Sequence, residues 1–380
     1  MNYKSSKRNS IEILETFIDK DLSKYAYLRN FDFGFEKRSN TSCLSPYISH
    51  GILSEIEVIK KSLKEHSFEK IEKFIQEILW RIYWKGWLEL RPSVWTDFIK
   101  DLKVEKSINL NNENYLNAIA GETKIKCFND WVNEIKKNNY LHNHARMWFA
   151  SIWIFTLKLP WQLGADFFLE NLYDGDAASN TLGWRWVGGL QTVGKHYLAK
   201  EDNIKKYTNN RYENIYLDEK ALPLKSKTQY SLINNKFLNP ELKKNKILLI
   251  FDNNLSFETS EFVNNDFKKI LIINNDCRKI NLSKNIKNFK NELIKDQQNR
   301  LTKNSIKNEI IKISELRNVN EELYSLYPCV GENLDFLKEN KINNIKFLYR
   351  EIDKFSWQYC KKGFFNFKNY IPEIINKFAK

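Results

Sequence analysis

A stretch near residue 80 combines a carboxylate, a guanidinium and several indoles at helical spacing. Glu77, Trp80, Arg81, Trp84 and Trp87 follow the i, i+3, i+4 pattern that places side chains on one face of a helix. Such a face suits a pocket in which a planar ligand stacks on aromatic rings while polar groups fix its edge. An ordinary half-buried helix with a Glu77–Arg81 ion pair would leave the same pattern, so the spacing alone keeps both interpretations open.

A second stretch has the residues of a phosphate-binding helix start. Ser45 before Pro46 predicts a helix N-terminus, because serine caps the first turn and proline lacks an N–H that this turn leaves unpaired. The hydroxyls of Thr41 and Ser42 lie just upstream. A helix start with free N–H groups and hydroxyls nearby suits a phosphate or pyrophosphate. A capped helix without a ligand remains the alternative.

The longest candidate segment runs from Leu141 to Trp186. If its last part is helical, Asp176, Asn180 and Trp184 are successive i, i+4 neighbours, which lines up a carboxylate, an amide and an indole. His142 and His144 are two residues apart, so on a helix they point in different directions. We therefore expect structural histidines there and no two-histidine metal site.

Composition limits the function classes. The net charge of +14 favours a polyanionic partner such as nucleic acid, although the Lys- and Asn-rich composition of an AT-rich genome would give the same charge. The five cysteines are odd in number and lack metal-ligand spacing, which argues against disulfide, zinc and iron–sulfur frameworks. The polar start and the lack of a long apolar run predict a soluble, cytoplasmic protein, with no membrane or metal partner.

The pattern of apolar residues changes along the chain and predicts a mainly α protein with two domains. Residues 1–202 have helical periodicity, as in Ile71, Phe74, Ile75 and Ile78, and residues 203–244 form a polar connector. Residues 245–380 predict a small α/β domain with parallel strands. Its expected elements are strands at 246–252, 269–275 and 344–350 and helices at 257–267 and 334–337.

The segments YLHNHARMWFAS and LYDGDAASNTLGWRW resemble the FAD-binding core of DNA photolyases and cryptochromes. TSCLSPYISHG and EILWRIYW match the same family in the same order, and Tyr25 with Arg29 resembles its Y-x-x-x-R motif. The resemblance covers about residues 10 to 200. It implies an all-helical photolyase-type FAD-binding domain, followed here by the small α/β domain.

The resemblance implies FAD as the cofactor and assigns its contacts position by position. The pyrophosphate would be held by Thr41, Ser42, Leu44 and Ser45, with Tyr25 nearby. Asn180 would face the flavin N5, and Arg146 would pair with Asp174 beside the ring, while Asp174 and Asp176 would contact the ring edge or ribose. Trp184 and Trp161 match the two inner tryptophans of the family's electron-transfer chain.

The resemblance also implies a DNA-lesion pocket that accepts a flipped pyrimidine dimer. Its residues would be Glu77, Trp80, Arg81, Asn143, Met147 and Trp186. Trp80 and Trp186 could replace the stacking that a flipped base loses, and Glu77 could accept hydrogen bonds from a base edge. Reduced FAD would supply the electron that splits the dimer. Glu77, Asn180, Trp161 and Trp184 are therefore the expected catalytic residues.

The sequence departs from the family pattern in several places. The usual N-terminal α/β antenna domain is missing, and the stretch from Ser107 to Asn114 has no outermost tryptophan, for which Trp131, Trp148 or Trp153 could substitute. Asn129 stands where an Asp is usual, and the chain after Trp186 differs from the usual continuation. We hypothesise that the C-terminal α/β domain takes the structural part of the antenna domain, in a circular-permutation-like arrangement.

Three functions are compatible with these patterns. The first is an enzyme, a deoxyribodipyrimidine photo-lyase that repairs pyrimidine dimers in DNA and acts as a monomer. The second is a cryptochrome-like blue-light photoreceptor without repair activity. The third is a nucleic-acid-binding flavoprotein that has lost its light chemistry. The complete set of lesion-pocket residues and the basic charge favour repair.

Overall fold

The computed structural model describes residues 3–192, 194–226 and 228–380, and the chain forms two compact units. The first unit comprises Lys24–Thr41 and Ser93–Ser231. The second comprises residues 3–23, Ser42–Pro92 and Leu232–Lys380. Each compact unit is assembled from separated segments, whereas the predicted domains are continuous, and the predicted boundary at 202 falls inside the helix Glu201–Tyr207.

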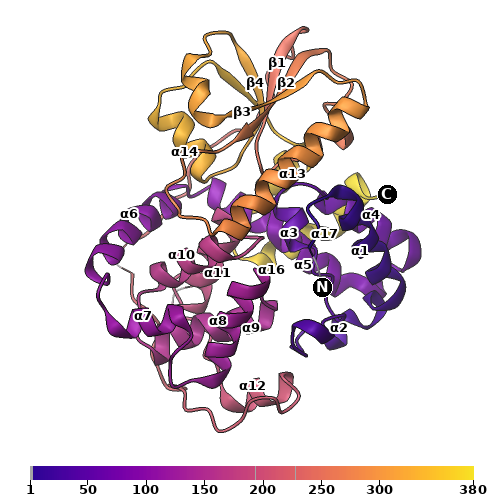
Figure 1. Ribbon diagram of the computed structural model, residues 1–380. Helices are drawn as coiled ribbons and strands as arrows, with labels where there is room; N and C mark the ends of the chain where they lie inside the picture. Colours follow the sequence, from indigo (N-terminus) through magenta and orange to yellow (C-terminus); the bar gives the residue numbers. More distant parts are fainter. Residues whose placement is uncertain (1–2, 193, 227) are drawn as a thin grey trace. The chain divides into compact units, whose positions relative to one another are not determined.

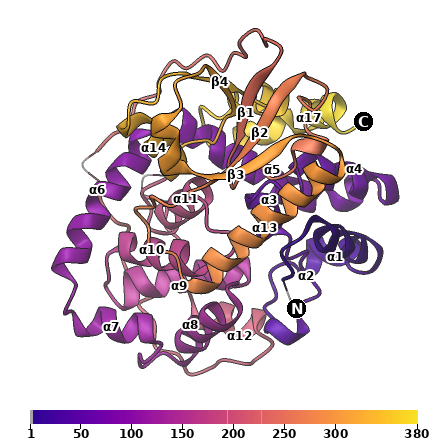
Figure 2. The ribbon, with the colours of Figure 1, turned by 45° about the horizontal axis from the view of Figure 1, so that its top comes forward.

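The first unit is helical among its described residues (Figures 1 and 2). Its α-helices are α2 (Tyr25–Leu28), α6 (Ser93–Ile108), α7 (Glu113–Ala120), α8 (Lys126–Asn138), α9 (Asn143–Ser151), α10 (Trp161–Asn171), α11 (Ala177–Val187) and α12 (Glu201–Tyr207). A π-helical turn, η3 (Ile152–Thr156), continues α9. Large rings fill the core: Trp95, Trp131, Trp148 and Trp153 are fully buried.

A buried ion network supports this helical core. The Asp32 carboxylate accepts hydrogen bonds from Arg38 at 2.9 Å and from Arg211 at 2.6 Å, and Arg38 also pairs with Glu134 at 2.8 Å. Burial alone would raise the pKa of Asp32, but the Arg38 and Arg211 guanidinium groups outweigh burial and lower the pKa to about 2. The carboxylate therefore stays charged and keeps the network intact near neutral pH.

The second unit combines helices from the N-terminal part of the chain with the C-terminal α/β segment. The helices are α1 (Lys7–Lys20), α3 (Ser45–Ser49), α4 (Glu55–Glu65), α5 (Phe68–Glu89), α13 (Lys284–Lys303), α14 (Glu332–Glu339), α15 (Glu351–Trp357), α16 (Phe364–Phe367) and α17 (Ile371–Phe378). The strands are β1 (Lys246–Ile250), β2 (Phe267–Asn274), β3 (Asn308–Lys312), β4 (Leu323–Leu326) and β5 (Ile345–Leu348).

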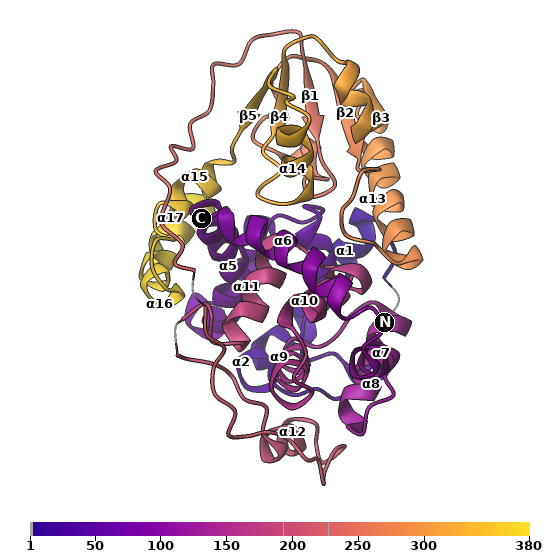
Figure 3. The same cartoon turned by 90° about the vertical axis from the view of Figure 1, so that its left-hand side faces the viewer.

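The five strands form one parallel sheet in the order β3-β2-β1-β4-β5. Figure 3 shows this order, with α14 against one face and α13 beside β2 and β3. Leu249 and Phe251 point to the face that also buries Phe336 and Leu337 of α14. A parallel sheet covered on both faces needs such apolar strands, so the predicted mainly α fold with a small α/β part is confirmed.

The local predictions in the α/β segment were partly correct. Strands lie where 246–252, 269–275 and 344–350 predicted them, and α14 covers the predicted helix at 334–337. The predicted helix at 257–267 is wrong: only Phe257–Thr259 form a 3₁₀ turn. Asn264, Asn265 and Asp266 favour turns over helix there. The long helix α13 and strands β3 and β4 were not predicted, because their sequences are polar or short.

Two observations bear on other expectations from the sequence. Within the described residues, no helix is both long and apolar enough to cross a membrane. Beyond α12, the described part of the connector up to residue 244 contains no helix or strand. It nevertheless has specific contacts, since the backbone N–H of Leu224 donates to the carbonyl of Gly188 at 2.9 Å.

A glycine in α5 allows the close packing of α5 and α15. A Cβ atom at Gly86 would lie 2.7 Å from Sγ of Cys360 and even closer to the ring of Trp357, which is itself fully buried. Any side chain at position 86 would therefore have to displace Trp357 and Cys360.

We expect Gly86→Ala to lower the free energy of unfolding by about 1–3 kcal/mol, because overpacking a buried contact forces neighbours out of place. Denaturant unfolding would measure the change. Gly363→Ala is the matched control, since a Cβ there meets nothing within 4 Å. Equal stability of the two variants would contradict the account of this contact.

Candidate functional site

The predicted site residues fall into two groups, one in each compact unit. The first unit contains Tyr25, Thr41, Asn143, Arg146, Met147, Trp161, Asp174, Asp176, Asn180, Trp184 and Trp186. The second unit contains Ser42, Leu44, Ser45, Glu77, Trp80 and Arg81.

An arginine–aspartate pair fixes one end of the first group. Arg146 on α9 binds both oxygens of Asp174, with Nη1–Oδ1 and Nη2–Oδ2 distances of 3.0 Å. Its Nε donates to the carbonyl of Leu141 at 2.8 Å, and its guanidinium lies 5.1 Å from the ring of Tyr140. Two-point pairing of this kind fixes the direction of both groups. The structure thus brings together the two residues that the resemblance pairs.

Helix α11 places the predicted flavin-ring residues in line. Asp176 is the N-cap, and its Oδ1 accepts hydrogen bonds from the N–H groups of Ala178 at 3.0 Å and Ser179 at 3.1 Å. One turn on, Asn180 donates from Nδ2 to the carbonyl of Ala165 at 2.8 Å. This orientation leaves the amide oxygen of Asn180 to accept a further hydrogen bond. The predicted helical spacing of Asp176, Asn180 and Trp184 is confirmed.

Buried polar atoms on α11 fit a polar ring ligand. Among the described residues, Oγ of Ser179 and Nε1 of Trp184 are buried and have no hydrogen-bond partner. Buried donors are normally satisfied, so such atoms call for a missing partner. A flavin ring has nitrogen and oxygen acceptors along its edge, and the donors and acceptors of α11 therefore fit FAD.

The two predicted electron-transfer tryptophans are both buried in the first unit. Trp184 is 2% exposed and Trp161 is 8% exposed. Trp184 packs against Gly164 of α10, where a Cβ would overlap the Trp184 ring and would lie 3.0 Å from the ring of Trp153. Trp161 stacks on Phe98 with ring centroids 5.4 Å apart. Gly164, which the sequence analysis did not single out, therefore allows the close approach of α10 to Trp184.

The predicted lesion-pocket residues of the first unit lie at accessible positions. Asn143 is exposed at the start of α9, and Met147 is half-buried one turn further on, so both share a helix face. Trp186 is half-buried and stacks on Tyr197, with centroids 5.9 Å apart at 25°. Tyr25 and Thr41 are also half-buried.

The two histidines beside Asn143 make structural contacts. His142 is the N-cap of α9, and its Nδ1 accepts a hydrogen bond from the N–H of His144. Burial lowers the pKa of His142 to about 3. His144 bonds to the carbonyl of Asn30 at 2.8 Å and stacks on Trp148. In the described part of the chain, no group of three or more His, Cys, Asp or Glu is arranged to hold a metal.

The helix that follows the predicted phosphate-binding turn begins one residue earlier than expected. Helix α3 starts at Ser45, so the N-cap is Leu44, which has no side-chain cap, and the prediction that Ser45 caps the helix is wrong. Cys43 has φ 51° and turns the chain into the helix. Leu44 is fully buried, whereas Ser42 and Ser45 are half-buried.

Helix α5 confirms the predicted common face near residue 80. From Glu77 to Leu90, the half-exposed residues are Glu77, Trp80, Arg81, Trp84 and Trp87, and every other residue is buried. A helix buried on all remaining sides presents this mixed polar and aromatic stripe as its accessible surface.

One contact of Trp80 was not predicted. The ring of Phe364 on α16 stacks on Trp80 with centroids 3.6 Å apart and an angle of 10°. Tyr83 contributes to the same cluster, since its hydroxyl donates to the carbonyl of Lys362 at 2.9 Å. One face of the Trp80 indole is therefore covered from within the unit. Only tertiary packing brings residues 80 and 364 together, so no local pattern signals this contact.

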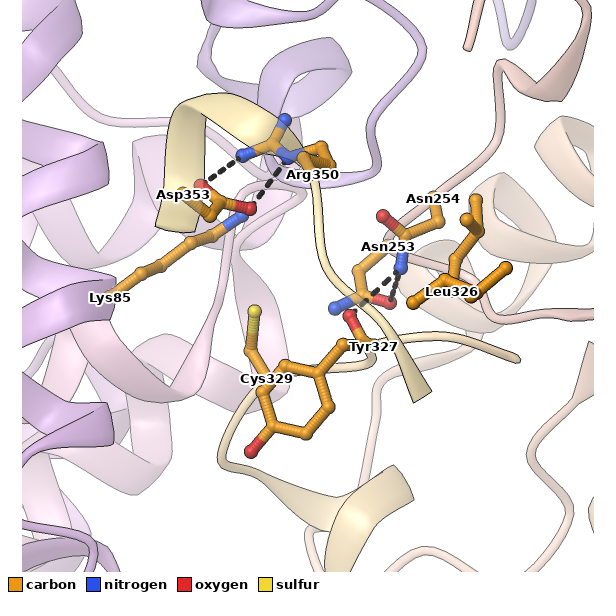
Figure 4. A pocket seen from close by; sticks show the side chains of 9 residues that line it. Lys85, Asn253, Asn254, Leu326, Tyr327, Cys329, Arg350 and Asp353 are labelled. Carbon is orange, nitrogen blue, oxygen red and sulfur yellow. Dashed lines mark hydrogen bonds and ion pairs between the residues drawn. The ribbon is translucent and has the colours of Figure 1, made fainter. Parts of the chain in front are cut away.

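A small polar pocket lies at the carboxyl ends of β1, β4 and β5 in the second unit (Figure 4). Its lining includes Lys85, Asn253, Cys329, Arg350 and Asp353. In open parallel sheets, ligands bind outside the strand ends where the strand order reverses, and here the reversal is between β1 and β4. Arg350 binds Asp353 through two nitrogens, at 2.7 and 2.8 Å, and so fills part of this pocket with an internal ion pair.

A buried glutamate lies close to this pocket. Glu89 accepts hydrogen bonds from the hydroxyl of Tyr327 at 2.8 Å and from the N–H of Val330 at 2.6 Å. Burial nevertheless raises the pKa of Glu89 to about 7. The side chain thus links α5 to the chain after β4 and changes its charge near neutral pH.

Comparison with known proteins supports the resemblance. Residues 74–220 match the family model described as the FAD binding domain of DNA photolyase. A deoxyribodipyrimidine photo-lyase of Buchnera aphidicola is 30% identical over 201 residues, which are 49% of this chain and 39% of that protein. One of Neurospora crassa is 28% identical over 198 residues, 49% of this chain and 31% of that protein. The chain thus spans about two fifths or less of these relatives.

Two solved structures are also similar. The class III photolyase of Agrobacterium tumefaciens has a TM-score of 0.43 and 26% identity, covering 54% of this chain and 43% of its own. The cryptochrome of Synechocystis has a TM-score of 0.48 and 19% identity, covering 55% of this chain and 44% of its own.

Over residues 74–220 the chain is similar to the FAD binding domain of DNA photolyase. The predicted resemblance and the predicted cofactor, FAD, are therefore confirmed. The roles of the individual site residues stay predictions.

We expect Gly164→Ala to destabilise the protein by about 1–3 kcal/mol, because the added methyl group overlaps the buried rings of Trp184 and Trp153. Denaturant unfolding followed by tryptophan fluorescence would measure the loss. Gly183→Ala on α11 is the control, since its Cβ meets nothing within 4 Å. Unchanged stability and fluorescence in Gly164→Ala would show that α10 does not hold Trp184 as described.

We expect Glu89 to make stability depend on pH. Its pKa in the folded protein is raised to about 7, so the folded state loses stability relative to the unfolded chain as pH rises from about 4.5 through 7. With Glu89→Gln, the decrease in the free energy of unfolding over this pH range should be about 1–3 kcal/mol smaller. Urea unfolding of both proteins at pH 5 and pH 8 would test this, and parallel pH profiles would contradict it.

Proposed function

We propose that this protein is an FAD-dependent photolyase that uses light to repair pyrimidine dimers in DNA. The observation that carries the proposal is the accessible stripe of α5, which includes Glu77, Trp80 and Arg81, the residues that the sequence resemblance assigns to the lesion pocket. These three residues lie inside the segment that matches the FAD-binding domain. Named relatives of the same domain are deoxyribodipyrimidine photo-lyases.

The proposal gives each flavin-side group a definite task. Asp174, held by Arg146, and Asp176 would bind the polar edge of the flavin or its ribose. The free amide oxygen of Asn180 would accept a hydrogen bond at N5. Thr41, Ser42, Leu44 and Ser45, with Tyr25, would hold the pyrophosphate. Trp161 and Trp184 would supply electrons that return the cofactor to its reduced state.

The lesion-side groups would bind the damaged bases. Trp80 and Trp186 would stack on the flipped dimer and compensate for its lost base stacking. The Glu77 carboxylate would accept hydrogen bonds from a base edge, and Arg81, Asn143 and Met147 would complete the contacts. When bound and reduced, FAD supplies one electron to the dimer, the two carbon–carbon bonds of its four-membered ring break, and the electron returns.

The net charge supports a nucleic-acid partner. At +14, the chain would gain affinity for DNA from counterion release, and binding would weaken as salt concentration rises. The alternative function is a cryptochrome-like photoreceptor without repair activity, and the lack of the family's outermost tryptophan between Ser107 and Asn114 does not distinguish it from repair. Cytoplasmic location, a monomeric state and an antenna-like part for the α/β segment belong to the same proposal.

Repair can be tested with a single-stranded oligonucleotide that contains one cyclobutane dimer. We expect the reduced holoprotein to restore the two pyrimidines under blue light and not in the dark, as measured by chromatography of the digested product. A protein that binds both FAD and the oligonucleotide but restores no pyrimidines would rule out repair, and would leave the photoreceptor and the nucleic-acid-binding flavoprotein without light chemistry.

The stacking role of Trp80 can be separated from its packing role. We expect Trp80→Ala to weaken binding of the dimer-containing oligonucleotide by about 1–3 kcal/mol, because a stacked base loses its aromatic partner. Phe364→Ala is the matched control, since it removes the internal stack and leaves Trp80 in place. Equal losses in both variants would assign Trp80 to packing against α16 and not to DNA.

A further inference from the structure

A line of three oxidisable rings leads from the buried Trp184 toward the surface of the first unit. Trp153 contacts Trp184 with ring centroids 6.1 Å apart at 84°, and Tyr115 contacts Trp153 at 6.1 Å and 82°. Trp184 is 2% exposed, Trp153 is fully buried and Tyr115 is half-exposed. The three rings belong to α11, η3 and α7, which all lie in the same unit.

The other rings around this line cannot replace its members. Trp184 also contacts Phe168 at 5.1 Å and Phe149 at 6.3 Å, and Trp161 stacks on Phe98. Phenylalanine is much harder to oxidise than tryptophan or tyrosine. Because electron tunnelling falls off steeply with distance, a chain of touching tryptophan and tyrosine rings is the favoured route for stepwise transfer. Trp153 is the tryptophan that the structure places in ring contact with Trp184.

The surroundings of Tyr115 suit the loss of a proton on oxidation. Asp166 and Glu170 are four residues apart on α10 and share a helix face. Burial and then the negative charges of these two carboxylates raise the pKa of Tyr115 to about 12. Asp166 also pairs with Lys106 at 2.7 Å. These two carboxylates of α10 are the nearby groups that could accept a proton from an oxidised tyrosine.

We propose that Tyr115 is the terminal electron donor of this protein and that its electron reaches Trp184 through Trp153. The proposal rests on the proposed function, in which Trp184 supplies electrons to the flavin. The family's outermost tryptophan is absent between Ser107 and Asn114. The proposal gives its role, electron supply from the surface, to Trp153 and Tyr115.

Tyr115 would lose one electron and one proton in this route. When bound and photoexcited, oxidised FAD would serve as the oxidant, and Trp184 would give up one electron. Trp153 returns an electron to Trp184, and Tyr115 returns one to Trp153. The Tyr115 hydroxyl then loses its proton to one of the two carboxylates of α10, Asp166 or Glu170, and leaves a neutral tyrosyl radical. An external thiol restores Tyr115 by donating a hydrogen atom, and the protonated carboxylate releases its proton to solvent.

The radical itself is the test. The FAD-loaded protein, grown with ring-deuterated tyrosine or with ordinary tyrosine, would be illuminated with blue light and frozen for electron paramagnetic resonance. We expect a neutral tyrosyl signal whose hyperfine width shrinks on deuteration. The signal should be lost in Tyr115→Phe and in Trp153→Phe, and retained in the control Tyr27→Phe, whose tyrosine is 79% exposed.

The variants separate the possible failures. Tyr115→Phe removes a single oxygen from a half-exposed ring, so it tests the proposal even if Trp153→Phe fails to fold. A tyrosyl signal that survives in Tyr115→Phe, or loss of the radical in Trp161→Phe with retention in Trp153→Phe, would overturn the proposal. Trp184→Phe should also lose the signal while it keeps the FAD absorbance. A signal that persists in Trp184→Phe would instead refute the role of Trp184 in the proposed function.

Discussion

The close approach of α10 to Trp184 is the constraint on which the predicted flavin-binding residues of α11 depend. Gly164 has no side chain, and this allows the Trp184 ring to occupy the space that a Cβ would fill. The same pair of helices is joined by the hydrogen bond from Asn180 to the carbonyl of Ala165, the next residue along α10. The lack of a side chain at Gly164 thus determines where the Trp184 indole lies, and the Ala165 carbonyl determines the direction of the Asn180 amide.

The same contact determines what surrounds the indole. Trp184 lies against Phe168 of α10 and against Trp153 of the π-helical turn η3. A π-helical turn shifts the side chains that follow it relative to a regular helix, and such turns occur often at functional sites. Here the turn contains Trp153 itself. The electron route proposed above therefore follows from how α9 ends as well as from which residues are present.

The sequence predicted those features that depend on local spacing. The common face of Glu77, Trp80 and Arg81 and the line from Asp176 to Trp184 both follow from helical periodicity, and the structure has both. Features that join distant residues could not be predicted this way. The stacking of Phe364 on Trp80 and the contact of Tyr115 with Trp153 depend on tertiary packing, for which the sequence has no local signal. The polar sequence of α13 likewise hides a helix that is stabilised by packing on β2 and β3.

The central claim is that light absorbed by reduced FAD drives repair, and an action spectrum tests it most directly. The rate of dimer splitting per incident photon would be measured across the near-ultraviolet and blue range, on reduced holoprotein with saturating oligonucleotide. The account predicts that this rate follows the absorption spectrum of the reduced flavin. No splitting at any wavelength, with FAD and DNA both bound, would contradict it.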